Sequence, residues 1–289
     1  MLKVIKDVGF RFAPFRYVYR GFFRIYSDKV SDTVMVSFPK SGHTWLRVML
    51  AKVISLHYDI KKLDLDLVLM VRGRPKIPRI AINHEIAPTF GVNFDLKQKK
   101  FLGAYGRSDV VSIRPVLRTK KTIFLVRDPR DVVVSLFFHL TKRNKFYNSS
   151  DISRFLQERF SLSKIINYMN LWHREMQRRP DQFLLVKYED LQKDTAGQLK
   201  RVTDFLGIDA SPDVIMEAVH FGSVDNMRKM ERSDSFIDYR LRAKNKNDVE
   251  SYKVRKAKVG GYNDYLSPAD ISYLNGRLEA ELHPDFGYR

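Results

Sequence analysis

The sequence predicts an α/β fold, a single domain in which a parallel β-sheet is flanked by helices. Short apolar segments alternate with helical patterns along the chain, which favours strands joined through crossover helices. At 289 residues the chain can bury one large core, and no Pro/Ser-rich linker or repeat divides it. We expect residues 1–30 to form a basic, aromatic N-terminal extension and residues 31–289 to form the main domain.

The first predicted strand, loop and helix form a site for an anion. Thr33–Val36 is apolar and predicts a buried strand, Gly42 lies in the turn that follows, and Thr44–Leu56 is apolar at helical spacing. A helix N-terminus presents free N–H groups and the positive end of its dipole. Lys40 and Ser41 add a cation and a hydroxyl, although their order differs from a Walker A loop. The alternative is an ordinary strand–helix turn with a surface lysine.

A second strand and helix follow the same plan. Ile123–Val126 predicts a buried strand, after which Asp128 is placed to cap a helix that starts with Pro129. Arg127 stands at the end of the strand, and Ser135 lies two turns into the helix. An arginine fork and a hydroxyl suit a second phosphate. The alternative is a structural arginine that pairs with a nearby aspartate.

The rest of the chain continues the alternation. Pro78–His84 predicts a strand that ends at a histidine, and Phe183–Val186 predicts a strand followed by Tyr188. Helical patterns extend over Ile152–Gln177 and Leu191–Leu206. Ligands of such folds bind beyond the carboxyl ends of the strands. Because the lysine, histidine, arginine and tyrosine named above all follow strands, the sequence predicts one shared site.

Five motifs in chain order resemble the nucleotide-binding signature of the PAPS-dependent sulfotransferases, where PAPS is 3′-phosphoadenosine 5′-phosphosulfate. The two loops above match those that hold the 5′-phosphosulfate and the 3′-phosphate in that family. Lys187–Leu191 resembles its Tyr-Glu-Asp-Leu segment, Ser223–Lys229 its Ser-Phe-x-x-Met segment, and Arg255–Tyr262 its late Arg-Lys-Gly…Gly loop. The resemblance runs from about Thr33 to Leu266 and implies a P-loop-NTPase-like sulfotransferase fold.

The resemblance implies in-line transfer of the sulfuryl group from PAPS to a hydroxyl, or less often an amine, without a metal. As in phosphoryl transfer, positioning and charge stabilisation would do most of the work. His84 would be the base and Lys40 would stabilise the leaving group, with Ser135 as a third catalytic candidate. Ile82 replaces the lysine of the family's Lys-Thr-His segment. A strand-end histidine bonded to backbone is the alternative for His84.

The expected nucleotide-binding residues are Lys40, Ser41, Gly42, His43, Thr44, Trp45, Arg127, Ser135, Tyr188, Ser223, Arg255, Lys256 and Ala257. By resemblance, Trp45 would stack on adenine and Tyr188 would contact it, with core packing as the alternative for Trp45. Val224 replaces the family's stacking phenylalanine, and Phe221 is a neighbouring substitute. Ala257 replaces a glycine and would weaken nucleotide binding if that glycine serves an unusual backbone dihedral.

The charge and composition restrict the partners. A net charge of +19 can steer a polyanionic cofactor, but it also fits an anionic acceptor, a membrane surface or a solubilising surface. The chain has no cysteine, so disulfides and thiolate chemistry are excluded, and no metal-ligand spacing is present. Charged residues are frequent in Lys61–Arg79 and Arg232–Val254, where the family places its acceptor loops. We expect a small-molecule or carbohydrate acceptor that is polar or anionic.

Residues 10–26 interleave aromatic residues with arginines. The segment is too short and charged for a transmembrane helix and lacks the apolar core of a signal peptide. It suits an interfacial anchor on anionic lipid, and the alternative is an extension packed across the domain. We therefore expect a cytoplasmic protein, with peripheral membrane contact as an open question.

Two other function classes stay open. A P-loop nucleotide or small-molecule kinase would need a Walker-type lysine and a carboxylate that holds Mg²⁺, and neither stands where it should. A basic nucleic-acid-binding protein would fit the charge and the aromatic N-terminus. It would leave the ordered motifs unexplained, so no nucleic-acid partner is expected.

Overall fold

The computed structural model describes residues 25–84, 113–143, 147–233 and 252–289, together with residues 94, 95, 100, 101, 111, 246 and 248. Its centre is a four-stranded parallel sheet in the order β2-β1-β5-β6, which confirms the predicted fold class. The strands are β1 (Thr33–Ser37), β2 (Ile80–Asn83), β5 (Lys121–Val126) and β6 (Phe183–Lys187). A separate antiparallel pair is formed by β3 (Phe94–Asp95) and β4 (Lys100–Phe101). Because all four central strands are parallel, their carboxyl ends meet at one edge.

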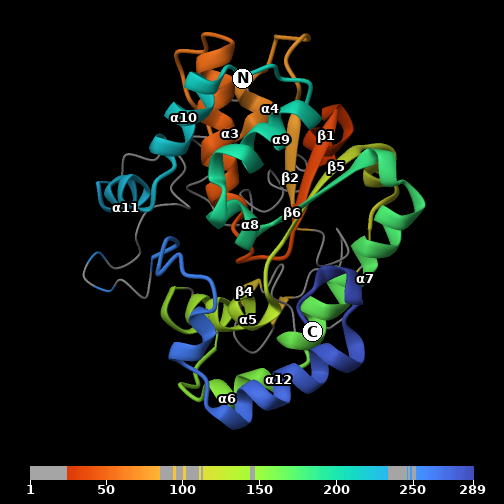
Figure 1. Cartoon of the computed structure of the whole chain (residues 1–289), viewed down its shortest axis with the longest axis vertical. Coiled ribbons are helices and arrows are strands. Elements are labelled where there is room, and N and C mark those ends of the chain that lie inside the picture. Colours follow the sequence, from red (N-terminus) through yellow and green to blue (C-terminus); the bar gives the residue numbers. More distant parts are fainter. Residues whose placement is uncertain are drawn as a thin grey trace.

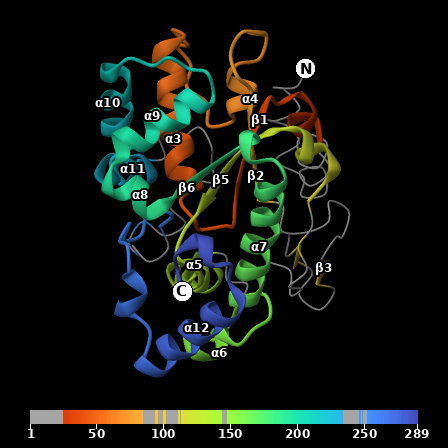
Figure 2. The same ribbon diagram turned by 45° about the vertical axis from the view of Figure 1, so that its right-hand side comes forward.

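Helices cover both faces of the central sheet (Figures 1 and 2). One face packs against α3 (His43–His57), α9 (Thr195–Phe205) and α10 (Pro212–Phe221). The other packs against α5 (Pro129–Phe138), α7 (Leu162–Arg178) and α12 (Pro268–Glu281). Strand β5 shows why two separate cores result: Phe124 belongs to one, and its neighbours Ile123 and Leu125 belong to the other.

Shorter elements connect these layers. The helices are α4 (Leu67–Met70), α6 (Ile152–Leu156), α8 (Tyr188–Lys193) and α11 (Val224–Arg232), and η3 (His139–Arg143) is π-helical. The 3₁₀ turns are η2 (Pro115–Thr119), η4 (Pro180–Gln182), η7 (Gly261–Asp264) and η8 (Pro284–Phe286). Of these, α8 follows β6 directly at the carboxyl edge of the sheet, whereas η2 and η4 lead into β5 and β6 at the amino edge.

Two predicted long helices are wrong in their extent. The pattern over Ile152–Gln177 is divided into α6 and α7, because the hydroxyl of Ser161 donates to the carbonyl of Leu156 at 2.9 Å and ends the first helix. The pattern over Leu191–Leu206 is divided into α8 and α9, because the side chain of Asp194 accepts from Gly197 N and caps the second helix. Local side-chain hydrogen bonds therefore overrode the apolar periodicity.

The described chain begins with a short helix over residues 25–30. Asp28 is 1% exposed, accepts from Asn83 Nδ2 at 3.1 Å and pairs with Arg114, so this segment packs against the end of β2. Of the predicted anchor segment only Ile25 and Tyr26 are described, and both are exposed, while the rest lies outside the described residues.

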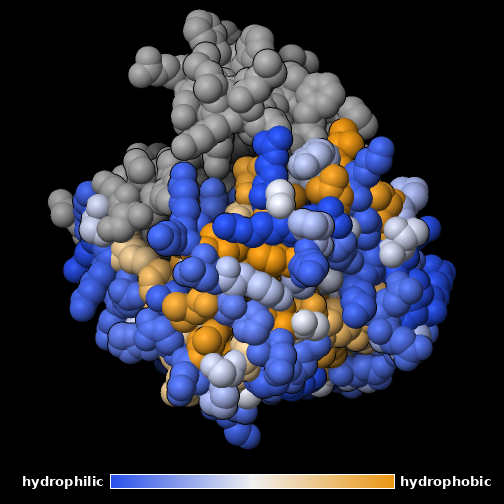
Figure 3. Space-filling model, turned by 90° about the horizontal axis from the view of Figure 1, so that it is seen from above, coloured by the Kyte–Doolittle hydropathy of each residue, from blue (hydrophilic) through white to orange (hydrophobic). Residues whose placement is uncertain are grey.

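The described surface is largely polar. In the view from above, apolar side chains occur in small groups between hydrophilic ones (Figure 3). Within the described ranges, each helix is either too short or too polar to span a bilayer.

Candidate active site

A cavity of about 310 Å³ opens at the carboxyl edge of the sheet, a size that suits a small-molecule site. Residues from all four strand ends line it, as the sequence predicted. Twelve of the predicted site residues contribute: Lys40, Gly42, His43, Thr44, Trp45, His84, Arg127, Ser135, Tyr188, Arg255, Lys256 and Ala257. Ser41 is buried and does not line the cavity, and Ser223 caps α11 by accepting from Asn226 N.

The loop between β1 and α3 takes an unusual backbone path. Lys40 has φ 79° and Gly42 has φ 99°, so two residues of this turn are left-handed. A Cβ on Gly42 would stand 2.5 Å from the ring of Tyr188. The left-handed backbone and this close approach therefore both favour glycine here. No side chain caps the first turn of α3. The positive end of the helix dipole therefore faces the cavity directly.

Lys40 is half-buried and lies among positive charges. Burial and the charges of Arg143, Arg255 and Arg127 together lower its pKa to about 7, while Glu231 acts in the opposite direction. A desolvated ammonium group surrounded by other cations is unfavourable on its own. The site is therefore built to receive negative charge.

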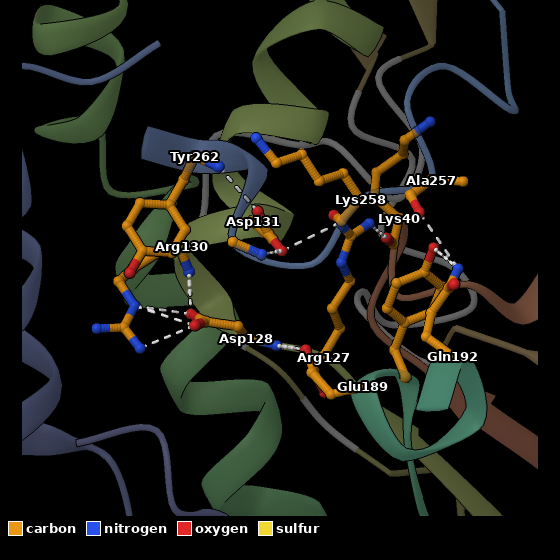
Figure 4. A network of polar contacts seen from close by, with 12 residues as sticks. Lys40, Arg127, Asp128, Arg130, Asp131, Glu189, Gln192, Ala257, Lys258 and Tyr262 are labelled. Carbon is orange, nitrogen blue, oxygen red and sulfur yellow. Dashed lines mark hydrogen bonds and ion pairs between the residues drawn. The ribbon is translucent and has the colours of Figure 1, made fainter. Parts of the chain in front are cut away.

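Arg127 is held in place by several partners (Figure 4). Its guanidinium lies 3.2 Å from the carboxylate of Asp131, donates to the carbonyl of Lys258 at 3.0 Å, and stands over the ring of Tyr188 at 4.3 Å. Arg127 therefore has the aspartate partner that the alternative interpretation named, and it also lines the cavity. Its Nε is buried and has no hydrogen-bond partner among the described residues.

Two carboxylates tie the strand-end segments together, as Figure 4 shows. Asp131 accepts from the backbone N–H groups of Gly260 and Tyr262, each at 3.0 Å, so it joins α5 to the late loop. Glu189 accepts from the backbone N–H of Asp128 at 2.9 Å and from the hydroxyl of Tyr288 at 2.6 Å. The Tyr-Glu-Asp segment therefore fixes the start of α5 relative to the C-terminus.

Three histidines stand at the other end of the cavity. His84 Nδ1 lies 2.8 Å from the carbonyl of Ser37, and since a carbonyl only accepts, Nδ1 carries the proton and Nε2 is the basic nitrogen. The ring of His43 meets that of His84 edge-on at 4.3 Å. Burial holds the pKa of His43 and of His139 far below the usual range, so both rings stay neutral.

The aromatic residues of the site contact one another. Trp45 donates through Nε1 to the carbonyl of Gly222 at 2.8 Å, and its ring meets Tyr188 edge-on at 5.7 Å. Val224 lines the cavity, whereas Phe221 packs beneath the ammonium of Lys52 and does not. The position of Phe221 therefore does not support its use in place of the family's stacking phenylalanine.

The late loop carries strain and charge. Ala257 adopts φ 51°, the left-handed conformation that favours glycine. Lys256 and Lys258 both pair with Asp264, at 3.1 and 2.9 Å. The guanidinium of Arg255 stands over the ring of Phe138 at 4.4 Å. Asp264 and Phe138 thus hold the three cations of this loop in position.

Several cavity residues were missed by the sequence analysis, among them Arg47, His139, Gln192 and Lys253. A signal for the first three was present. Each stands four positions after a predicted site residue, since they follow His43, Ser135 and Tyr188 respectively, and residues four apart share one helix face. Lys253 lies in the charged segment Arg232–Val254 that the resemblance assigns to an acceptor loop, but no spacing singled it out, because only the folded loop brings it to the cavity.

Comparison with known proteins shows that the chain is similar in sequence to the members of one family. The family model described as "Sulfotransferase domain" matches residues 30–284. Among curated proteins, Cytosolic sulfotransferase 17 of Arabidopsis thaliana is 22% identical over 271 residues, covering 90% of this chain and 76% of the relative. Sulfotransferase 2A1 of Rattus norvegicus is 25% identical over 256 residues, covering 83% and 80%.

Solved structures have the same fold. Mouse sulfotransferase SULT7A1 complexed with PAP is similar with a TM-score of 0.58 and 21% identity, covering 87% of this chain and 84% of that one. Retinol dehydratase in complex with androsterone and the inactive cofactor PAP gives a TM-score of 0.60 and 18% identity, covering 86% and 80%.

Proposed function

Because this chain belongs to the sulfotransferase family, we propose that it transfers the sulfuryl group of PAPS to a hydroxyl of a small-molecule acceptor and releases adenosine 3′,5′-bisphosphate (PAP). The observation that carries the proposal is the cavity, which Lys40, His84 and Arg127 line from three strand ends. A half-buried cation, a histidine base and an arginine fork suit in-line transfer, in which positioning and charge stabilisation do most of the work.

The cavity residues fit the nucleotide. The buried Nε of Arg127 is a donor without a partner among the described residues, and a phosphate oxygen would satisfy it. Lys40 would regain its full charge beside an anion. PAPS would supply both the anion and the sulfuryl group. The phosphosulfate and the adenine would be held by Lys40, Gly42, His43, Thr44, Trp45 and Tyr188. The 3′-phosphate would be held by Arg127, Ser135, Arg255, Lys256 and Ala257.

His84 is the proposed general base. Its Nδ1–H donates to Ser37, which orients the ring and leaves Nε2 to take the proton of the acceptor hydroxyl. The neutral ring of His43 stands beside it and adds no competing charge. Lys40 is the proposed stabiliser of the leaving group, and removing one such donor typically costs about 100- to 1,000-fold in rate.

Two finer predictions stay proposals. Contact of residues 10–26 with anionic lipid concerns a segment that lies almost wholly outside the described residues. The division into an extension over residues 1–30 and a sulfotransferase domain over residues 31–289 is proposed on the same sequence pattern.

Calorimetric titration tests the cofactor. We expect tight, chelator-insensitive binding of PAP, much weaker binding of AMP, and weak binding of ATP–Mg²⁺. The variant Arg127→Met should weaken PAP far more than AMP, because only PAP carries the 3′-phosphate. Equal weakening of both would remove Arg127 from the 3′-phosphate site, and a preference for ATP–Mg²⁺ would favour a kinase.

A further inference from the structure

The cavity has more positive charge than its nucleotide end alone explains. Seven lysine and arginine side chains line it, against one carboxylate among the described lining residues, that of Asp131, and Asp264 pairs with two of the lysines, Lys256 and Lys258. A phosphomonoester carries nearly two negative charges at neutral pH, so PAPS as a whole carries about four. Five of the basic residues belong to the nucleotide-binding segments, and two, Arg47 and Lys253, do not.

Arg47 faces the end of the cavity where the histidines stand. It follows His43 by one turn of α3 and is only 7% exposed, yet it lines the cavity. Burial and the charge of His84 lower the pKa of His43 most, and the charges of Arg47 and Lys253 lower it as well. Both cations therefore act on the histidine that touches the proposed base.

Lys253 is fixed by a buried anchor. Its backbone N–H donates to Glu231 Oε1 at 2.8 Å, and the N–H of Val254 donates to Oε2 at 3.2 Å. Glu231 is in turn paired with Arg143 at 3.1 Å, and both side chains are almost completely buried. Arg228 holds the same segment by donating to the carbonyl of Val254 at 3.2 Å. The loop thus presents Lys253 from a fixed position.

We propose that Arg47 and Lys253 form a subsite for an anionic group on the acceptor. The acceptor would be a hydroxyl compound that also bears a carboxylate, phosphate or sulfate, with the hydroxyl at His84 and the anion at the two cations. This inference rests on the proposed function and names the chemical class of its second substrate. A guanidinium and an ammonium group in a sheltered cavity bind such an anion through charge-assisted hydrogen bonds.

Matched acceptors test the subsite. The assay would measure transfer of a radiolabelled sulfuryl group from PAPS to each acceptor. It would compare 4-hydroxybenzoate with its neutral methyl ester, and 4-hydroxyphenyl phosphate with phenol. We expect kcat/KM to favour the anionic member of at least one pair by about tenfold or more, the usual range for a buried charge-assisted contact. The preferred pair identifies which anion the subsite takes. Equal or lower values for the anionic members of both pairs would overturn the proposal.

Variants place the preference on the two cations. Arg47→Met and Lys253→Met should each reduce the anionic-to-neutral ratio about tenfold, mainly through KM, while PAP affinity stays unchanged. Arg47→Lys should retain part of the ratio, and Lys193→Met should retain all of it as a control for net charge, because Lys193 is exposed and does not line the cavity. A ratio that survives both Met variants would overturn the assignment. Absence of PAP binding in the unmodified protein would instead remove the proposed function, and this inference with it.

Discussion

The state of a single lysine couples the proposed cofactor site to pH. The pKa of Lys40 is lowered to about 7 by burial and by the surrounding arginines. The unfolded chain keeps this proton up to a pH near 10.5, the ordinary value for lysine. In the ligand-free protein, Lys40 therefore costs stability below pH 7, and that cost diminishes as the pH rises between the two values.

Anion binding should reverse this shift. At pH 8.5 free Lys40 is mostly neutral, and a bound phosphosulfate or phosphate would restore its charge, so PAP binding should take up on the order of one proton. Calorimetry in two buffers of different ionisation enthalpy measures the uptake. Lys40→Met should abolish it, whereas the exposed Lys76→Met should leave it intact. Heats that do not depend on the buffer in the unmodified protein would contradict the assignment.

The proposed base is a second feature of residue scale. His84→Ala should lower kcat by about 100- to 10,000-fold, because a general base contributes that much, while PAP affinity is retained. The exposed His57 of α3 does not line the cavity, so His57→Ala is a matched control. A near-native rate for His84→Ala with a verified acceptor would rule out its role as base.

At the scale of elements, side-chain carboxylates join segments that the sheet only brings near. Glu189 links the starts of α8 and α5 to the C-terminus, and Asp131 links α5 to the late loop. Glu231 links α11 to the segment at Lys253. The cavity walls thus depend on polar contacts between loops as well as on the apolar core.

The late loop contains a strained position that can be relieved. An alanine held in the left-handed conformation costs about 1–2 kcal/mol. Glycine removes this cost, but it makes the unfolded chain more flexible, which lowers the free energy of unfolding by about 0.4–1 kcal/mol. Ala257→Gly should therefore raise the free energy of unfolding by about 0.5–1 kcal/mol and tighten PAP binding, since φ is 51° there. Ala257→Val should act in the opposite direction. Urea unfolding and calorimetry check both, and a loss of stability in the glycine variant would refute the strain.

At the scale of the whole molecule, the cavity concentrates basic residues that are distant in the chain. Lys40, Arg127 and Lys253 come from separate loops, and the parallel sheet directs the first two to one edge. The net charge of +19 is therefore partly accounted for by one site and can steer polyanions toward it.

Local patterns by themselves determined the four central strands, the starts of α3 and α5, and the four strand-end residues, whereas the short pair β3 and β4 was not predicted. Those features depend on apolar periodicity, capping and turn chemistry within a few residues, which a sequence displays directly. The breaks at Ser161 and Asp194 were missed, because a single side-chain hydrogen bond can end a helix whose apolar pattern continues.

Tertiary structure alone decided the electrostatics of the cavity. The lowered pKa of Lys40 results from burial and from cations such as Arg143, more than 100 positions away in the chain. The position of Lys253 results from the carboxylate of Glu231, 22 positions away. The left-handed backbone of Ala257 likewise follows from the path of a loop held at several points. Desolvation and charge proximity are properties of packing in three dimensions, so no local pattern could have revealed them.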